Sequence, residues 1–218
     1  MSLDSFLLPS SLRASLTEAA HRYASHVEEA SFYLAARGIG RDAATGHLLG
    51  KVCDPAPGHE RFEGMLCIPY VLHTGDVVAM KFRRIDDSEG PKYDSPSGQT
   101  ARLYNARTLA EGGPLALICE GELDAIAAEE HLGVPSVGTP GTTWMDWWAR
   151  CFGDFDRVVV VADHDAKEDG SDPGLKHARK VQKTIEGAEL VTPPAGHDMT
   201  SWINEYGVDA VRKGLGLD

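Results

Sequence analysis

The sequence predicts an α/β protein in which a smaller mixed α/β region precedes a parallel sheet covered by helices on both faces. After residue 112, short strands alternate with helices along the chain. Each of these strands is apolar at successive positions, which is typical of parallel strands buried on both faces. Before residue 112, a helical start, a predicted hairpin and a long polar loop replace this alternation.

The first region begins with helical periodicity. Apolar residues recur at helical spacing between Leu12 and Leu34, and Gly38 is a natural stop. The dipeptide at 25–26, "SH", is a point at which two helices could divide. The segments "GMLCIPYVL" and "DVVAMKFRRI" predict two strands joined by a turn at "HTGD". Residues 86–100 form a polar loop rich in Gly, Pro and Ser, and loops of this length are often functional.

The second region carries the strand and helix alternation. The predicted strands are residues 115–119, 134–138, 157–163 and 188–194. The predicted helices are residues 121–133, 142–152 and 174–187, followed by helical segments within 199–216. Trp144, Trp147 and Trp148 lie at positions i, i+3 and i+4, which favours the buried face of a helix over a base-stacking platform.

Composition narrows the class of protein. A net charge of −12 argues against non-specific nucleic-acid binding through the overall field, although it is compatible with a local basic groove. The four cysteines contain no C-x-x-C pair, so we expect reduced thiols. The N-terminal stretch has neither a basic n-region nor an apolar run that would suit a signal peptide or membrane span. We therefore expect a soluble protein of the cytoplasm, with no membrane partner.

Two of the predicted strands end in acidic residues. Glu120 ends the first strand, and Asp124 follows it by one helical turn. Asp163 and Asp165 follow the strand "VVVV". In open parallel sheets, ligands bind beyond the carboxyl ends of the strands. Carboxylate oxygens suit Mg²⁺ or Mn²⁺, so the repulsion between these acids would become affinity for a cation.

A single acid after a strand also has an ordinary structural interpretation. It often lies in a solvated turn or caps a helix, and Asp169 or Asp172 could cap the helix that starts near Gly174. Two acidic strand ends in one sheet, with the turn "GTPGTT" between them, favour a functional site.

Several motifs resemble a known family. "LICEGELDA" and "VVVVADHD" resemble the two signature motifs of the Toprim domain. Upstream, "FYLAARGIGRDAATGHLLG" and "GPKYDSPSGQTARLYN" are similar to segments of bacterial and phage-type (DnaG-like) primases. The resemblance implies a Toprim-type parallel sheet flanked by helices, preceded by a smaller mixed α/β primase subdomain. The implied domains are an N-terminal subdomain at 1–112, a Toprim domain at 113–200 and a C-terminal helical segment at 201–218.

The resemblance also implies roles for individual residues. The catalytic acids would be Glu120, Asp124, Asp163 and Asp165. The ligands of Mg²⁺ or Mn²⁺ would be Glu120, Asp163, Asp165 and Asp198. The residues that contact nucleotide or template would be Lys81, Arg83, Arg84 and Lys92. Asp198 lies in a motif that usually carries a second acid, where this sequence has Thr200.

The implied activity is that of a primase catalytic core, a DNA-directed RNA polymerase. It would make short RNA primers from ribonucleoside triphosphates on a single-stranded DNA template by metal-dependent nucleotidyl transfer. Because family members usually carry a zinc-binding module and work with a helicase, we expect a separate zinc-binding template-recognition protein and a replicative helicase as partners. We predict no zinc site, since the spacing of Cys53, His59, Cys67 and His73 fits no standard finger.

Two other functions use the same fold. A Toprim-type nuclease would cut DNA with the same acids, and only the primase-like first half argues against it. A non-catalytic, replication-associated Toprim module would keep the fold without metal dependence, and the four intact acids, Glu120, Asp124, Asp163 and Asp165, argue against that function.

Overall fold

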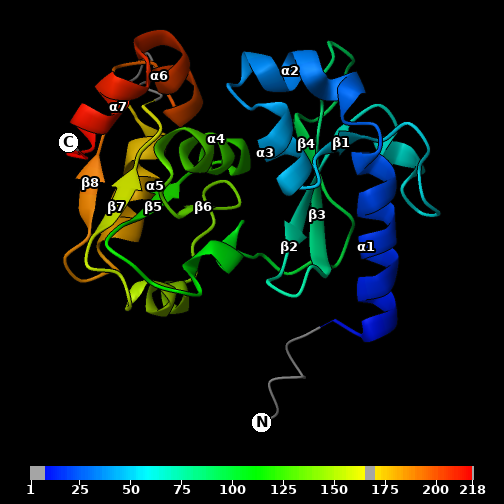
Figure 1. Ribbon diagram of the computed structural model, residues 1–218, viewed down its shortest axis with the longest axis horizontal. Coiled ribbons are helices and arrows are strands. Elements are labelled where there is room, and N and C mark those ends of the chain that lie inside the picture. The colour runs from blue at the N-terminus through cyan, green and yellow to red at the C-terminus, as the bar shows by residue number, and fades with distance from the viewer. Residues whose placement is uncertain (1–7, 165–169, 218) are drawn as a thin grey trace. The chain divides into compact units, whose positions relative to one another are not determined.

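The structure is a computed structural model that describes residues 8–164 and 170–217 (Figure 1). The chain forms two compact units. The first consists of the residues up to Ala36 together with Gly40–Thr100, and the second of Arg37–Ile39 together with Ala101–Asp218. Residues 101–112 thus group with the second unit, while the three-domain division expected from the sequence stays a prediction. Among the helices that the structure describes, none is both long and apolar enough to cross a membrane.

The first unit pairs three α-helices with an antiparallel sheet. The helices are α1 (Ser10–Ala24), α2 (Ser31–Ala36) and α3 (Arg41–Gly46), with short 3-10 turns η2 (Glu28–Ala30) and η3 (Glu60–Phe62). The strands are β1 (Gly50–Lys51), β2 (Leu66–Val71), β3 (Val77–Arg83) and β4 (Tyr93–Asp94), hydrogen-bonded in the order β1-β2-β3-β4. The predicted hairpin and the predicted division of the first helical stretch near Ser25 are both confirmed.

Three aromatic side chains, Tyr23, Phe62 and Phe82, belong to the core of the first unit. The rings of Phe62 and Phe82 stack with centroids 3.9 Å apart, and both side chains are fully buried. Tyr23 on α1 is also buried, and its hydroxyl hydrogen-bonds with His59 Nδ1 at 2.8 Å and accepts from the Ala56 amide at 2.9 Å. A buried tyrosine with a satisfied hydroxyl fixes α1 against the sheet and the loop after β1.

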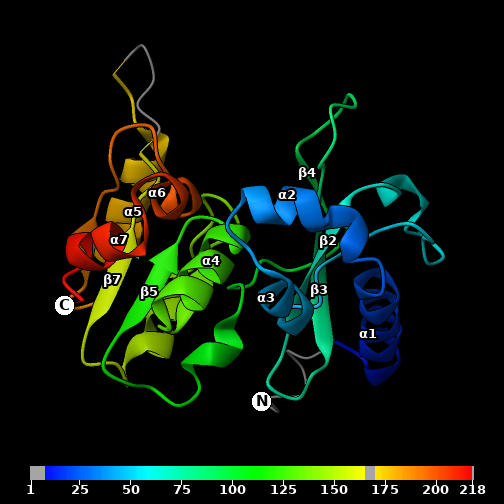
Figure 2. The ribbon, with the colours of Figure 1, turned by 45° about the horizontal axis from the view of Figure 1, so that its top comes forward.

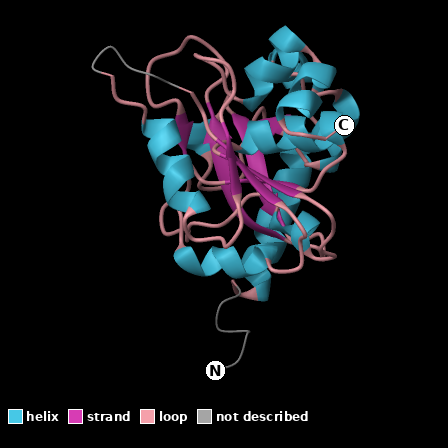
Figure 3. Ribbon diagram, turned by 90° about the vertical axis from the view of Figure 1, so that its left-hand side faces the viewer, coloured by secondary structure: helices cyan, strands magenta, loops and turns pink. Residues whose placement is uncertain are grey.

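The second unit contains a wholly parallel sheet in the order β6-β5-β7-β8. Its strands are β5 (Ala116–Cys119), β6 (Ser136–Gly138), β7 (Val158–Val161) and β8 (Glu189–Val191). Its helices are α4 (Glu122–Leu132), α5 (Pro173–Gln182), α6 (Met199–Tyr206) and α7 (Val208–Gly214), with 3-10 segments η4 (Ala106–Leu109) and η5 (Asp146–Phe152). The alternation of strands and helices predicted from the sequence is confirmed (Figures 1 and 3).

Helices cover both faces of the parallel sheet (Figure 2). On one face, Ile118 and Val160 share a buried cluster with Ala178 and Val181 of α5. Leu117 and Val159 alternate with these residues along the strands and are also fully buried, so they lie on the opposite face, where α4 packs on β5 and β6. This double burial explains why the strands read as continuous apolar runs.

One predicted helix takes a different form. The segment with three tryptophans is an α-helix in the sequence prediction, whereas the structure has the 3-10 segment η5 there. Trp144 and Trp148 are buried as expected, but Trp147 is 62% exposed. Trp144 precedes η5, which begins at Asp146, so helical spacing does not relate it to Trp147. With three residues per turn, the successive residues Trp147 and Trp148 point about 120° apart, and of these two Trp148 faces the core.

Candidate active site

The carboxyl edge of the parallel sheet gathers the acidic residues. Glu120 directly follows β5, and Asp163 follows β7 after a single residue. The two strands are hydrogen-bonded neighbours, with Ile118 opposite Val160, so both acids reach the same edge. Beside them, burial raises the pKa of the Cys119 thiol well above its usual range, and the carboxylates of Asp124, Asp163 and Asp198 raise it further. The structure therefore brings together four of the acids singled out in the sequence.

Asp124 is the most deeply buried of these acids. It lies in the first turn of α4, is 8% exposed, and accepts a hydrogen bond from the Thr200 amide at 3.0 Å. A Cβ atom placed on Gly121 would lie 2.4 Å from Asp124 Oδ2, so the carboxylate packs directly against the helix entrance. Burial, and next the charge of Asp198, raise the pKa of Asp124 to about 6. Asp124 consequently changes protonation just below neutral pH.

Asp198 has a capping role that the sequence prediction did not include. Its Oδ1 accepts from the Ser201 amide at 2.7 Å, and its own amide donates to Ser201 Oγ at 3.0 Å, so the two residues form a capping box at the start of α6. Its Oδ2 lies 3.7 Å from Arg37 Nη1. Burial acts to raise the pKa of Asp198, but the hydrogen bonds and Arg37 outweigh it and lower the pKa. Asp198 is therefore held as a carboxylate.

Thr200 connects the two acids. Its amide donates to Asp124 Oδ1, and its hydroxyl donates to Asp198 Oδ1 at 2.9 Å. The residue that stands where a second acid is usual thus bridges α4 and the start of α6, through its amide to Asp124 and its hydroxyl to Asp198. This bridge joins residues that are far apart in the sequence.

The segment after Asp163 is described only in part. Asp165, Glu168 and Asp169 lie outside the described residues. Asp172 caps α5 by accepting from the Leu175 amide at 2.9 Å, as the sequence predicted for this position. A Cβ atom on Gly174 would lie 2.4 Å from the carbonyl oxygen of Asp163, so the first turn of α5 packs directly against that acid.

Among the described residues, the oxygens of the edge acids do not form a group of three within 4.8 Å of one another. The chemistry of the donor set nevertheless fits a hard divalent cation, because carboxylates at one sheet edge are the ligands that Mg²⁺ and Mn²⁺ prefer. The fourth predicted ligand, Asp165, belongs to the part of the chain that is not described.

A cationic cluster surrounds Tyr93 in the first unit. Lys81 Nζ, Arg83 Cζ and Lys92 Nζ lie 4.2, 4.9 and 6.0 Å from the centroid of its ring. Cations over an aromatic face are attracted to its quadrupole, but three like charges around one ring also repel each other. A bound anion would relieve that repulsion. We call Lys81, Arg83 and Lys92 the Tyr93 cluster.

The arginines of "KFRR" are less accessible than the sequence indicates. Arg83 is only 5% exposed. Its Nη1 donates a hydrogen bond to the Tyr93 hydroxyl, and its Cζ lies 5.4 Å from the ring centroid of Tyr33. Arg84 lies 3.9 Å from Asp86 and donates from Nε to the Pro91 carbonyl at 3.4 Å. Both arginines therefore hold the strand end and its loop, and within this group Lys92 is the exposed cation. Their contact with nucleotide or template stays a prediction.

A row of exposed cations on α5 and at its C-terminal end was not among the predicted site residues. Lys176, Arg179, Lys180 and Lys183 recur at helical spacing on one face, and none of them forms an ion pair within the described parts of the chain. They line a groove of about 610 Å³ together with Asp146, Asp172 and Thr184. The spacing in "KHARKVQK" was the available signal. We call these four residues the α5 row.

A known phage protein is similar to this chain in sequence. The chain is 36% identical over 155 residues to the gene 57 protein of Mycobacterium phage D29, a match that spans 69% of this chain and 97% of the phage protein. No family model matches the chain.

Two solved structures are similar in fold. A structure of the DnaG catalytic core matches with a TM-score of 0.78 at 17% identity, covering 94% of this chain and 79% of that one. A DnaG primase catalytic domain bound to single-stranded DNA matches with a TM-score of 0.74 at 17% identity, covering 96% and 83%. The chain therefore has the fold of the DnaG catalytic core.

The raised pKa of Asp124 predicts how stability depends on pH. The folded protein binds the Asp124 proton below about pH 6, and the unfolded chain only near the ordinary value of 3.8. The unfolding free energy of metal-free protein should thus fall as pH rises through this window, by up to about 3 kcal/mol from this group. In Asp124→Asn that decrease should be absent. Urea unfolding at several values between about pH 4 and about pH 7 measures it.

The matched control is Asp209→Asn, which removes an exposed acid from the first turn of α7. It should keep the pH dependence of the parent protein. If Asp124→Asn also keeps the pH dependence of the parent protein, then burial does not destabilise the charged form of Asp124.

Proposed function

This chain belongs to the family of the Mycobacterium phage D29 gene 57 protein, and from that premise and its DnaG-core fold we propose that it is a DNA primase catalytic core. It makes short RNA primers on single-stranded DNA by nucleotidyl transfer, in the cytoplasm of a bacterial or phage-infected cell. The observation that carries the proposal is the meeting of Glu120 and Asp163 at the carboxyl edge of the sheet, within this fold.

The carboxylates define what the site does. Glu120, Asp163 and Asp198, with Asp165, are the residues that would hold Mg²⁺ or Mn²⁺. Bound there, the cation would supply charge stabilisation for the attacking hydroxyl and the leaving pyrophosphate. Asp198 is already ionised, because its hydrogen bonds and Arg37 lower its pKa. It therefore requires no deprotonation on binding a cation.

Asp124 and Thr200 act as positioning residues in this proposal. Thr200 ties the carboxylate of Asp124 to that of Asp198, so the entrance of α4 and the start of α6 are held at a fixed separation. Glu120 precedes that entrance by a single residue, Gly121. Loss of the bridge would move Asp198 relative to Glu120 without removing a ligand.

The nucleic acid is the second requirement of the activity. In a chain with a net charge of −12, the Tyr93 cluster and the α5 row are concentrations of positive charge that suit phosphates. One DnaG catalytic domain of the same fold is bound to single-stranded DNA. We propose that both surfaces bind the phosphates of the template or of the incoming ribonucleoside triphosphate. A replicative helicase and a separate zinc-binding template-recognition protein remain part of the proposal as partners.

The nuclease and the non-catalytic module are weaker proposals. Both require only the Toprim-like second unit, whereas the fold match to the DnaG core covers 94% of the chain and so includes the first unit. The Tyr93 cluster also lies in the first unit, where a Toprim nuclease has no need for it.

A primer-synthesis assay tests the proposal. The protein is incubated with single-stranded DNA, labelled ribonucleoside triphosphates and Mg²⁺ or Mn²⁺. We expect short RNA products, reduced at least about 100-fold in Asp163→Ala, Asp165→Ala and Glu120→Gln, because each variant removes a carboxylate that would hold the cation, and the cation would offset transition-state charge. Asp209→Asn should retain the parent activity. Shortened DNA without RNA products would favour the nuclease, and no metal-dependent reaction would favour the non-catalytic module.

The salt dependence of DNA binding tests the two cationic surfaces. Two double variants are compared with the parent protein. One carries Lys81→Ala and Lys92→Ala in the Tyr93 cluster, and the other carries Lys176→Ala and Lys183→Ala in the α5 row. Each pair should reduce the slope of log affinity against log salt for single-stranded DNA by about 1.4, at ~0.7 per phosphate contact. The control, Arg150→Ala with Lys213→Ala, removes the same charge from exposed residues outside both surfaces. An equal decrease of this slope in the control would show that DNA binding depends on the overall charge of the protein and not on these two surfaces.

A further inference from the structure

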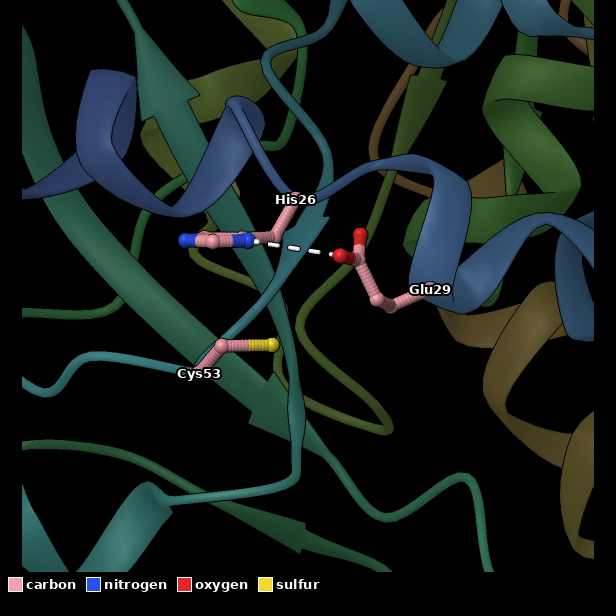
Figure 4. A group of neighbouring side chains, drawn as sticks. All are labelled: His26, Glu29 and Cys53. Carbon is pink, nitrogen blue, oxygen red and sulfur yellow. Dashed lines mark hydrogen bonds and ion pairs between the residues drawn. The ribbon is translucent and has the colours of Figure 1, made fainter.

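A second group of metal-ligating side chains lies in the first unit. His26, Glu29 and Cys53 each direct one ligand atom toward a common point, and the three atoms lie within 4.8 Å of one another (Figure 4). His26 Nδ1 and Glu29 Oε1 are 3.5 Å apart. Over residues 8–164 and 170–217, this is the single group of three such side chains that comes this close.

The backbone brings the three residues together. His26 follows α1, and its amide donates to the Tyr23 carbonyl at 2.9 Å, which closes the end of that helix. Glu29 lies three residues on, in η2, so its side chain returns to the same side as His26. Cys53 comes from a separate segment just after β1.

Two contacts hold Cys53 beside His26. The Lys51 amide donates to the His26 carbonyl at 3.3 Å, which pairs the end of β1 with the turn after α1. A Cβ atom on Gly50 would lie 1.9 Å from the Tyr23 carbonyl oxygen, so only glycine lets β1 approach the helix end this closely.

The residue before Cys53 is anchored as well. Val52 is fully buried, its amide donates to the Met65 carbonyl at 2.9 Å, and its own carbonyl accepts from Gly64 at 2.8 Å. These two hydrogen bonds and the burial of Val52 fix the backbone just before Cys53, and so they fix the position of the Cys53 thiol.

The donor set selects the class of metal. A thiolate sulfur, an imidazole nitrogen and a carboxylate oxygen suit Zn²⁺, with bonds of about 2.0–2.3 Å, whereas Mg²⁺ takes oxygen ligands. Cys53 and Glu29 are exposed and His26 is partly exposed, so an ion has access. We propose that His26, Glu29 and Cys53 form a Zn²⁺ site with three protein ligands and a fourth position open to water.

This set differs from Cys53, His59, Cys67 and His73, whose spacing fits no standard zinc finger and for which no zinc site was predicted. Cys67 is fully buried in β2, and His59 Nδ1 is hydrogen-bonded to the Tyr23 hydroxyl. Neither residue belongs to the group of three ligand atoms that includes Cys53. The true neighbours of Cys53 precede it by more than twenty residues and lie in no zinc-finger spacing. On binding, the ion takes the place of the thiol proton, which is released to solvent as the sulfur–metal bond forms.

Cobalt titration of the full-length chain tests the site. Co²⁺ reports thiolate ligation through a ligand-to-metal charge-transfer band in the near ultraviolet. We expect this band to saturate at one equivalent, to disappear when Zn²⁺ is added, and to be absent in Cys53→Ser. His26→Ala and Glu29→Gln should weaken Co²⁺ affinity at least about tenfold, as loss of a contact at a metal site does.

The matched controls separate this site from other thiols and from the acidic edge. Cys151→Ser removes another exposed free cysteine and should leave the band unchanged, and so should Asp163→Asn. No band in the parent protein, or a band that persists in Cys53→Ser, would overturn the proposal. Neither outcome depends on primer synthesis, so the zinc site and the primase function stand or fall separately.

Discussion

The parallel pairing of β5 with β7 is the constraint on which the rest of the second unit depends. Leu117 opposite Val159 and Ile118 opposite Val160 set the register, and that register delivers Glu120 and Asp163 to one edge of the sheet. Since a parallel pair is stable only when both of its faces are covered, the helices α4 and α5 are part of the same requirement. The first turns of both helices then lie beside the acids, as the close approaches of Gly121 and Gly174 show.

The acids at this edge are not equivalent, and their surroundings explain why. Asp124 is buried and close to another carboxylate, which favours its protonated form, whereas Asp198 receives several hydrogen bonds and faces Arg37, which favours its charged form. Thr200 donates to both. The protein thus offsets part of the repulsion between these carboxylates itself, through the amide and hydroxyl of Thr200 and through one arginine from the loop after α2.

Much of this arrangement could be predicted from the sequence. Apolar runs identified the buried strands, and the acids after them identified the edge of the sheet, because both signals are local. The bridge from Thr200 to Asp124, the burial of Arg83 and the grouping of His26 with Cys53 could not be predicted in this way. Each depends on a contact between segments distant in sequence, and for Cys53 that contact exists because Gly50 lets a strand approach a helix end.

The most direct test of the central claim is to locate a divalent cation at the acidic edge. Crystals of the protein soaked in Mn²⁺ would be measured for anomalous scattering. We expect a peak within bonding distance of the Glu120 and Asp163 carboxylates, at roughly 2.0–2.6 Å for hard cations on oxygen. Absence of a peak there, at a Mn²⁺ concentration that supports primer synthesis, would contradict the assignment of this edge as the catalytic centre.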